Sequence, residues 1–195
     1  MIVYGLTGSI GMGKSTAAHM LRSMGVMVHD ADATARELLL PKGKAFEEVA
    51  VSFPDAWDKK NHLIRRDILA DIIFNDDDAR KTLENIAHPY IHEDQFYFIR
   101  KAKALGQDKA VLDIPLLYET GADKRVDKVI VVSAPDFIQA QRVLSRPNMN
   151  EELFEKILES QLLDAEKCVR ADYVVQTGLG RANTYKALEK IMRTG

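Results

Sequence analysis

The stretch Gly8-Ser9-Ile10-Gly11-Met12-Gly13-Lys14-Ser15 fits the spacing G-x-x-x-x-G-K-[ST] and predicts a loop that binds phosphate groups. Glycines let the backbone adopt positive φ angles and approach an anion without a clash from a Cβ atom. The N–H groups of such a loop converge on the anion, and the positive end of a helix beginning near Lys14 adds to the attraction. The Lys14 ammonium can reach the β- and γ-phosphates of a nucleotide, while the Ser15 hydroxyl can ligate Mg²⁺. Thr16 supplies a second hydroxyl beside the nucleotide.

The residues on either side of this loop support the interpretation. An apolar run, Ile2–Leu6, precedes the loop as a strand should, and a helical pattern follows it through Met24. Binding of ATP or GTP is therefore expected, with ATP favoured. A GTPase would carry D-x-x-G and [NT]-K-x-D motifs after the loop, and the chain has neither. A short chain with an insertion and a basic late helix favours a kinase of small molecules.

Five short apolar runs predict an α/β fold with a parallel sheet. Their nearly continuous hydrophobicity is typical of strands covered on both faces, so helical crossovers should connect them. The expected fold class is a P-loop NTPase of the nucleotide-kinase type, a three-layer sandwich with about five parallel strands. The second and third runs are too far apart for one crossover helix, so about residues 33–108 should form an inserted helical lobe. The predicted strands are Ile2–Leu6, Val26–His29, Ala110–Asp113, Lys128–Val132 and Tyr173–Val175.

The composition is that of an ordinary globular protein. Of the 195 residues, 46% are hydrophobic and 29% are charged, which excludes a largely disordered chain. The 27 lysines and arginines nearly balance the 29 aspartates and glutamates, so neither a nucleic-acid partner nor a membrane partner is expected. A single cysteine, Cys168, fits a reducing compartment, and the N-terminus lacks a secretory signal. We therefore expect a cytoplasmic protein.

Two carboxylates, in Asp30-Ala31-Asp32, follow the second predicted strand. In open α/β sheets the ligand crevice lies beyond the carboxyl ends of the strands, so this pair should face the phosphate loop. A carboxylate there could accept the proton of a substrate hydroxyl, or orient that hydroxyl for in-line attack. Strand alternation should send the two side chains to opposite faces, so that only one lines the site. Capping of the following helix is the alternative role.

Asp113 ends the third predicted strand and opens the stretch Asp113–Glu119. Its position after Ala110-Val111-Leu112 is that of an aspartate that holds Mg²⁺ directly or through water. Helix capping explains the same position equally well.

Residues 136–146 predict an amphipathic helix. Its polar face carries two guanidinium groups, which would stabilise charge on a transferring phosphoryl group if they faced the nucleotide. A solvated surface stripe is the alternative interpretation. The polar face consists of Gln139, Arg142 and Arg146, and the apolar face, roughly 200° away on a helical wheel, consists of Phe137, Ala140 and Leu144.

Pro89 predicts the start of another helix, which should run to about Leu105. His88 would then be a helix-entry residue that can also line the inserted lobe. His88 and His92 are four residues apart, but neither an H-E-x-x-H motif nor a cysteine accompanies them, so zinc is not expected.

Several motifs form an ordered set that extends from Tyr4 to about Tyr185. The set comprises the loop Gly8–Thr16, Asp30-Ala31-Asp32, Leu63-Ile64-Arg65, His88-Pro89-Tyr90-Ile91, Asp113–Glu119, Gln139 with Arg142 and Arg146, and Gln161 with Ala171-Asp172. The chain thereby resembles the dephospho-coenzyme A kinase family, which catalyses the last step of coenzyme A synthesis. Many families share the phosphate loop, whereas the later motifs in this order are far more specific.

The resemblance implies that Mg·ATP phosphorylates the ribose 3′-hydroxyl of dephospho-CoA, giving CoA and ADP. It implies one kinase domain over residues 1–195, with a substrate lobe at about 33–108 and a mobile lid at about 142–165. Asp32 is the implied catalytic base, with Lys14 and Arg142 as further catalytic residues, and the enzyme is expected to be a monomer or a weak homo-oligomer. The ATP site would comprise Gly8, Gly11, Met12, Gly13, Lys14, Ser15, Thr16 and Arg146, the acceptor site Thr7, Asp32, Arg65, His88 and Leu116, and the Mg²⁺ site Ser15 and Asp113.

Some residues depart from the usual pattern of the family. Ser9 stands where the family usually has a third glycine, and Met12 replaces a small residue. Lys156 replaces a common lid arginine, and Thr177 replaces a common asparagine on the adenine side. His62 stands where glycine is usual, so the turns of the lobe should differ.

Two other functions are compatible with the phosphate loop. One is a kinase of another nucleoside or nucleotide, and the other is a regulatory module that senses ATP without transferring phosphate. The presence of Asp32, Asp113 and the two arginines of residues 136–146 argues against the regulatory module.

Overall fold

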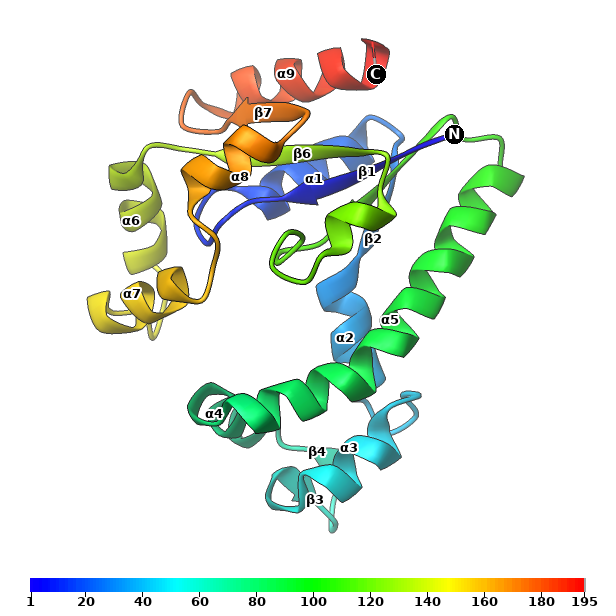
Figure 1. Cartoon of the computed structure of the whole chain (residues 1–195), viewed down its shortest axis with the longest axis vertical. Coiled ribbons are helices and arrows are strands. Elements are labelled where there is room, and N and C mark those ends of the chain that lie inside the picture. Colours follow the sequence, from blue (N-terminus) through cyan, green and yellow to red (C-terminus); the bar gives the residue numbers. More distant parts are fainter. Residues whose placement is uncertain (195) are drawn as a thin grey trace. The chain divides into compact units, whose positions relative to one another are not determined.

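The computed structural model describes residues 1–194, which form two compact units (Figure 1). The core unit contains residues 1–30 and the chain from Ile99 onward, and the helical unit contains Ala31–Phe98. Each unit has its own hydrophobic core. The helical unit is therefore a single insertion into the chain of the core unit.

The core unit is built on a five-stranded parallel sheet with the order β2-β5-β1-β6-β7 (Figure 1). The five predicted strands are confirmed, each end lying within one residue of the expected bound. In register, Leu6 of β1 and Asp30 of β2 lie on either side of Asp113 of β5. The strands are β1 (Ile2–Thr7), β2 (Met27–Asp30), β5 (Lys109–Asp113), β6 (Lys128–Ser133) and β7 (Tyr173–Gln176).

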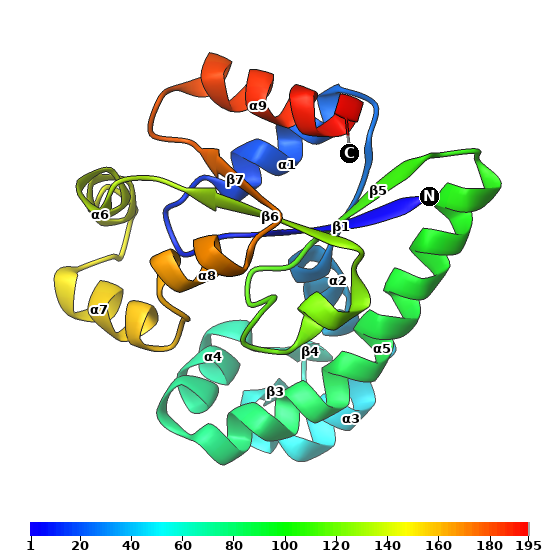
Figure 2. The same ribbon diagram turned by 45° about the horizontal axis from the view of Figure 1, so that its top comes forward.

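Helices cover both faces of this sheet and complete the predicted three-layer sandwich. On one face, α1 (Lys14–Ser23) and α9 (Arg181–Thr194) pack against each other, while α8 (Asp164–Arg170) lies on the other face (Figure 2). The core includes Tyr4, Leu21 and Leu188, which are fully buried. Burial on both faces explains why the strands read as continuous apolar runs. The remaining elements of this unit are η2 (Ala122–Arg125), α6 (Asp136–Leu144) and α7 (Glu151–Glu159).

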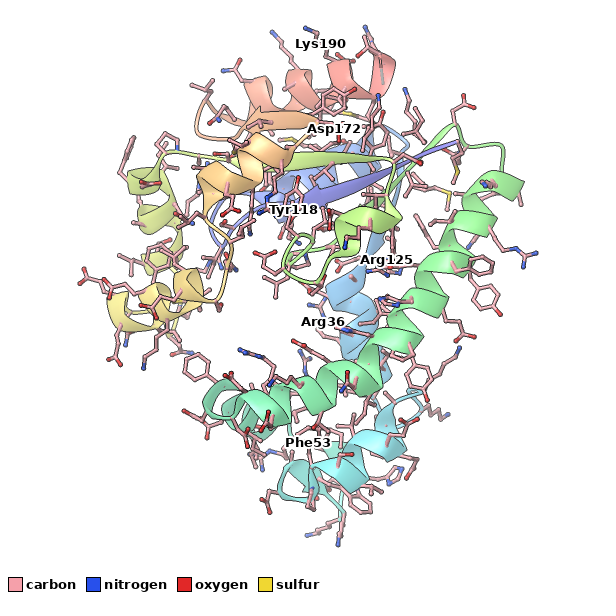
Figure 3. The ribbon with its side chains drawn as sticks, viewed as in Figure 1. Arg36, Phe53, Tyr118, Arg125, Asp172 and Lys190 are labelled. Carbon is pink, nitrogen blue, oxygen red and sulfur yellow. The ribbon has the colours of Figure 1, made fainter. Side chains whose placement is uncertain are left out.

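The helical unit packs around a second hydrophobic core. Phe46, Phe53 and Leu69 lie in this core and are almost fully buried (Figure 3 labels Phe53). His62 lies between the two strands of a small antiparallel pair, where its φ of 50° is one that glycine adopts more readily. The elements are α2 (Ala31–Leu38), α3 (Phe46–Ser52), η1 (Pro54–Ala56), β3 (Trp57–Asp58), β4 (Leu63–Ile64), α4 (Arg66–Asn75) and the part of α5 (Asp77–Ala104) that precedes Ile99.

The prediction that a helix starts at Pro89 is wrong. α5 starts at Asp77, and Asp76 caps it. The Asp76 carboxylate accepts hydrogen bonds from the N–H groups of Asp78 and Ala79 at 2.8 and 3.1 Å. A side-chain acceptor of this kind satisfies helix donors that have no backbone partner.

The helix continues through Pro89 because both flanking turns are packed. Ile86 and Ile91, on either side of the proline, contact the core of the helical unit. This burial offsets the backbone hydrogen bond that proline cannot donate. His88 consequently lies inside α5 rather than at a helix entry. Although α5 has 28 residues, neither it nor another helix within residues 1–194 is long and apolar enough to cross a membrane.

Candidate active site

The predicted phosphate loop joins β1 to α1 at the carboxyl edge of the sheet. Gly11 and Gly13 have φ angles of 78° and 91°, which residues with a Cβ atom rarely adopt. At Gly8, a Cβ atom would lie 2.5 Å from Val132 Cγ2, so no side chain fits between the loop and β6. The shape of the loop therefore requires glycine at these three positions.

The start of α1 leaves N–H groups for a ligand. Ala17 N–H donates to the carbonyl of Gly13 at 3.1 Å. Among the described residues, the backbone offers no acceptor to the N–H groups of Lys14, Ser15 and Thr16, which precede it. The positive end of the helix macrodipole lies at the same place. The loop and helix start can therefore bind an anion such as a nucleotide phosphate.

Lys14 and Asp113 form an ion pair beside the loop. Lys14 Nζ lies 2.7 Å from Asp113 Oδ1, and the two side chains are 15% and 5% exposed. Because the pair is mostly shielded from water, salt screens its attraction less than that of a surface pair. A phosphate that approached Lys14 would compete with Asp113 for the ammonium group.

The structure also places Asp30 beside Asp113. Register partners in a parallel sheet have their side chains on the same face, so both carboxylates leave that face at the carboxyl edge. Asp32, in contrast, does not lie on a strand, because α2 starts at Ala31. The prediction that strand alternation separates Asp30 from Asp32 is therefore wrong. Residues two apart on a strand would share a face, and Asp32 lies on a helix instead. Asp32 lies in the first turn of α2, and its side chain is exposed.

The polar face of α6 is not a solvated stripe. Gln139 is 5% exposed, whereas Phe137 on the apolar face is 73% exposed. The Gln139 amide donates to the carbonyl of Ile10 in the phosphate loop at 2.7 Å. The loop presents carbonyl groups to α6, and these polar groups require donors rather than apolar side chains.

The Arg142 guanidinium is bonded to the loop and to the end of β7. Nη1 lies 3.3 Å from the carbonyl oxygen of Gly11 and 3.0 Å from Thr177 Oγ1, and Nη2 lies 2.9 Å from the carbonyl oxygen of Thr177. Arg146 follows α6 and is exposed. The two predicted arginines thus differ: Arg142 is part of the support of the loop, and Arg146 extends into solvent.

Three other predicted residues lie in the core unit. Thr7 is fully buried, and its hydroxyl donates to the carbonyl of Pro115 at 2.8 Å. Met12 is fully buried as well, with its sulfur 3.1 Å from the N–H of Ala134. Leu116 is partly exposed. The Met12 N–H donates to the carbonyl of Ser9 at 3.1 Å, and its carbonyl accepts from Thr177 Oγ1 at 2.7 Å. In this conformation, neither the side chain nor the backbone of Met12 is free for a ligand.

The helical unit holds the predicted acceptor residues Arg65 and His88. Arg65 Nη2 lies 2.7 Å from Asp67 Oδ2, and this hydrogen bond holds the pKa of the Asp67 carboxyl below its usual value. His88 is partly buried, and its ring stacks on His92 with centroids 5.9 Å apart. Neither residue is locked in a buried network.

Known proteins resemble the chain over almost its whole length. A sequence model of one family, CoaE, described as dephospho-CoA kinase, matches residues 1–181. The chain belongs to the dephospho-CoA kinase family. A dephospho-CoA kinase of Novosphingobium aromaticivorans is 45% identical over 191 residues, which cover 98% of this chain and 93% of that protein.

Two crystal structures show the same likeness. TT1252 from Thermus thermophilus has a TM-score of 0.85 at 31% identity, covering 98% of this chain and 96% of the other. Dephospho-CoA kinase from Campylobacter jejuni has a TM-score of 0.66 at 27% identity, covering 98% and 95%. Dephospho-CoA kinases are ATP-dependent enzymes, so ATP and dephospho-CoA are the substrates of this family member.

One buried ion pair in this kinase was not predicted. Lys167 of α8 is fully buried, and its Nζ lies 2.8 Å from Glu119 Oε1, which also accepts the N–H of Leu162 at 2.9 Å. Burial acts to raise the pKa of Glu119, but the hydrogen bonds from Lys167 and the backbone outweigh it and lower the pKa. Lysines are among the residues most often exposed, so the sequence carries no signal for this burial.

Two other side chains of the kinase are unsuited to act as bases or nucleophiles. Burial raises the pKa of Tyr118, in the loop after β5, to about 12 (Figure 3). Burial and the nearby Asp164 carboxylate also raise the pKa of the Cys168 thiol. Both groups are therefore protonated near neutral pH, and the carboxylates remain the candidates for a catalytic base.

Proposed function

We propose that the enzyme transfers the γ-phosphoryl group of ATP to the ribose 3′-hydroxyl of dephospho-CoA, giving CoA and ADP. The observation that carries this proposal is the glycine loop, whose N–H groups lie next to the Lys14–Asp113 ion pair. The loop can bind a triphosphate. When the ion pair separates, Lys14 can bind the phosphates and Asp113 can bind a cation.

On the donor side, the free N–H groups of the segment Gly11–Thr16, those of Gly11 and of Gly13–Thr16, bind the phosphates of ATP. Lys14 leaves Asp113 for the β- and γ-phosphates, where its charge stabilises the transferring group. Arg146, which is exposed after α6, adds positive charge at the same phosphates. Because the loop backbone is held in shape before ATP arrives, its N–H groups need little reorganisation at the moment of transfer.

Ser15 and Asp113 would hold Mg²⁺. Hydroxyl and carboxylate oxygens are the hard ligands that this ion prefers. The ammonium of Lys14, 2.7 Å from Asp113 Oδ1, supports this proposal, because Asp113 already pairs with a positive charge. When bound, Mg²⁺ neutralises charge on the β- and γ-phosphate oxygens.

On the acceptor side, Asp32 takes the proton of the 3′-hydroxyl. The bond from O3′ to the γ-phosphorus forms while the bond from that phosphorus to the β-phosphate oxygen breaks, and ADP leaves. Its exposure makes the Asp32 carboxylate accessible to a sugar hydroxyl. The remaining residues proposed for the acceptor site are Thr7, Arg65, His88 and Leu116.

We propose further that the enzyme works in the cytoplasm as a monomer or weak homo-oligomer, without a nucleic-acid or membrane partner. Its nearly balanced charges and its single cysteine support this assignment. Light scattering on the purified protein measures the oligomeric state.

Mass spectrometry of the product formed from ATP and dephospho-CoA tests the proposed reaction. The expected product carries one additional phosphoryl group and has the retention time of CoA. AMP, CMP and uridine serve as competing acceptors in parallel reactions. Phosphorylation of one of these in preference to dephospho-CoA would overturn the proposed substrate.

A further inference from the structure

We propose that Gln139, Arg142 and Thr177 are positioning residues that aim the N–H groups of the phosphate loop at ATP. The inference rests on the proposed function, since it needs the loop to bind nucleotide phosphates. Each residue donates a hydrogen bond to one of three consecutive loop carbonyls. We call the three side chains the carbonyl clamp.

The contacts of the carbonyl clamp follow the loop in order. Gln139 Nε2 lies 2.7 Å from the carbonyl oxygen of Ile10. Arg142 Nη1 lies 3.3 Å from that of Gly11, and Thr177 Oγ1 lies 2.7 Å from that of Met12. The donors come from α6 and from the end of β7, which are distant in sequence from the loop.

Peptide geometry converts these contacts into an orientation of the N–H groups. In a trans peptide, the carbonyl of one residue and the N–H of the next lie in one plane and point in opposite directions. Bonds to the carbonyls of Ile10 and Met12 therefore turn the N–H groups of Gly11 and Gly13 away from the clamp. The N–H of Met12 is held separately, by the carbonyl of Ser9 at 3.1 Å.

The clamp residues are themselves fixed. Gln139 and Thr177 are 5% and 7% exposed. Arg142 Nη1 donates to Thr177 Oγ1 at 3.0 Å, so the Thr177 hydroxyl proton is left for the carbonyl of Met12 at 2.7 Å. Arg142 Nη2 also donates to the Thr177 carbonyl at 2.9 Å. Two of the three clamp residues thus act as one unit.

A fourth contact closes the frame around the loop. The N–H of Ile10 donates to Gln161 Oε1 at 3.0 Å, from the segment between α7 and α8. Both the N–H and the carbonyl of Ile10 are therefore satisfied by glutamine side chains. The N–H groups of Ile10 and Met12 are therefore not available to ATP, which leaves those of Gly11 and of Gly13–Thr16 as the phosphate-binding donors.

The test is steady-state kinetics of Gln139→Leu and Thr177→Val, which remove the donors with little change in volume. KM for ATP should rise roughly tenfold in each, as expected for the loss of one buried hydrogen bond, while KM for dephospho-CoA stays unchanged. Gln141→Leu is the matched control, because Gln141 lies on the same helix and is exposed. Thr177→Ser should restore the wild-type KM for ATP, since the hydroxyl is retained.

A double variant distinguishes the clamp from a direct contact to adenine. If Gln139 and Thr177 act on the same loop, the combined rise in KM for ATP should be smaller than the product of the single effects. If the increases in KM for ATP of the two single variants simply multiply in the double variant, Thr177 acts independently of Gln139, as a direct contact to the adenine base would. An unchanged KM for ATP in both single variants, with wild-type acceptor phosphorylation, would overturn the clamp without affecting the proposed function. The proposed clamp would also be overturned if the variants lower the melting temperature but leave KM for ATP unchanged.

Discussion

The phosphate loop and the acceptor-side residues differ in how firmly the protein holds them. Around the loop, three consecutive carbonyls are bonded to side chains, and Lys14 is paired with an almost buried carboxylate. In the helical unit, Asp32 is exposed, and Arg65, itself exposed, pairs with Asp67, two positions along the chain. Side chains of the second kind keep their rotamer freedom until a ligand arrives.

This difference suggests a division of labour between the two sites. A prebuilt phosphate site gains affinity because little ordering accompanies binding. The exposed side chains proposed for the acceptor side, Asp32 and Arg65, would become ordered when the substrate binds, so their contacts would contribute to the choice of acceptor. Substitutions on the two sides should therefore affect different kinetic parameters, which the predictions for Lys14, Asp32 and Arg65 use.

The largest effect is expected for Lys14→Ala. The variant loses the ammonium group aimed at the transferring phosphate, so kcat/KM for ATP should fall by roughly 10³-fold. A coupled assay of ADP release measures it. Lys190→Ala, on an exposed position of α9, is the control and should retain wild-type activity (Figure 3). If Lys14→Ala keeps most of its activity, the phosphate loop does not take part in the reaction as proposed.

Asp32→Asn should lower kcat by roughly 10²-fold, because an amide cannot accept the proton of the 3′-hydroxyl. KM for ATP should stay near the wild-type value. Asp55→Asn, an exposed aspartate elsewhere in the helical unit, is the control. Asp30→Asn tests the alternative carboxylate. A greater decrease in kcat in this variant than in Asp32→Asn would show that the catalytic base is Asp30, in the core unit.

Glu119→Gln should lower the free energy of unfolding by about 3 kcal/mol, because it leaves Lys167 buried without its carboxylate. Urea unfolding measures the change, and Glu155→Gln on the exposed side of α7 is the control. An equal stability of the variant and the wild type would show that the ion pair does not stabilise this unit.

The same pair predicts a pH dependence. The pKa of Glu119 is lower in the folded chain than the ordinary value of 4.5, so its contribution is complete above that pH and is lost as the pH falls through the folded pKa. Wild-type stability should consequently decrease more steeply below about pH 4.5 than that of Glu119→Gln. Parallel pH profiles of the two proteins would contradict this assignment.

The smallest effect is expected for Arg65→Gln. KM for dephospho-CoA should rise severalfold to about tenfold, as for the loss of a charged hydrogen bond to the substrate. KM for ATP and the melting temperature should not change, because the exposed pair with Asp67 adds little to stability. Arg66→Gln, at the next position, is the control. An increase in KM for ATP instead would place Arg65 on the donor side.

Local patterns were enough to predict the sheet and the loop. Strand positions follow from runs such as Ile2–Leu6 and Lys128–Val132, since burial on both faces leaves no polar residue to interrupt them. The loop follows from its spacing of glycines, which reflects steric needs at Gly8, Gly11 and Gly13. Such features depend on neighbours in sequence, and the chain displays them directly.

Other features depended on partners distant in sequence. Pro89 predicted a helix start, but packing on both sides of it keeps α5 continuous. The polar side of α6 could equally have been a solvated stripe, because the carbonyls that it serves belong to residues 10 and 11. Lys167 lies three residues after Asp164 on its own helix, yet its ion-pair partner is Glu119, which is distant in sequence. These outcomes follow from contacts that no local pattern encodes.

The amino-acid sequence by itself determined the parallel sheet and the phosphate loop of a P-loop fold, because apolar strand runs and the glycine spacing are local consequences of burial and backbone sterics. Only the tertiary structure decided which groups hold the loop in shape and which carboxylate stands beside Lys14. Those arrangements bring together residues such as Met12 and Thr177, which are far apart along the chain. A hydrogen bond needs two atoms about 3 Å apart, and only folding brings such pairs together.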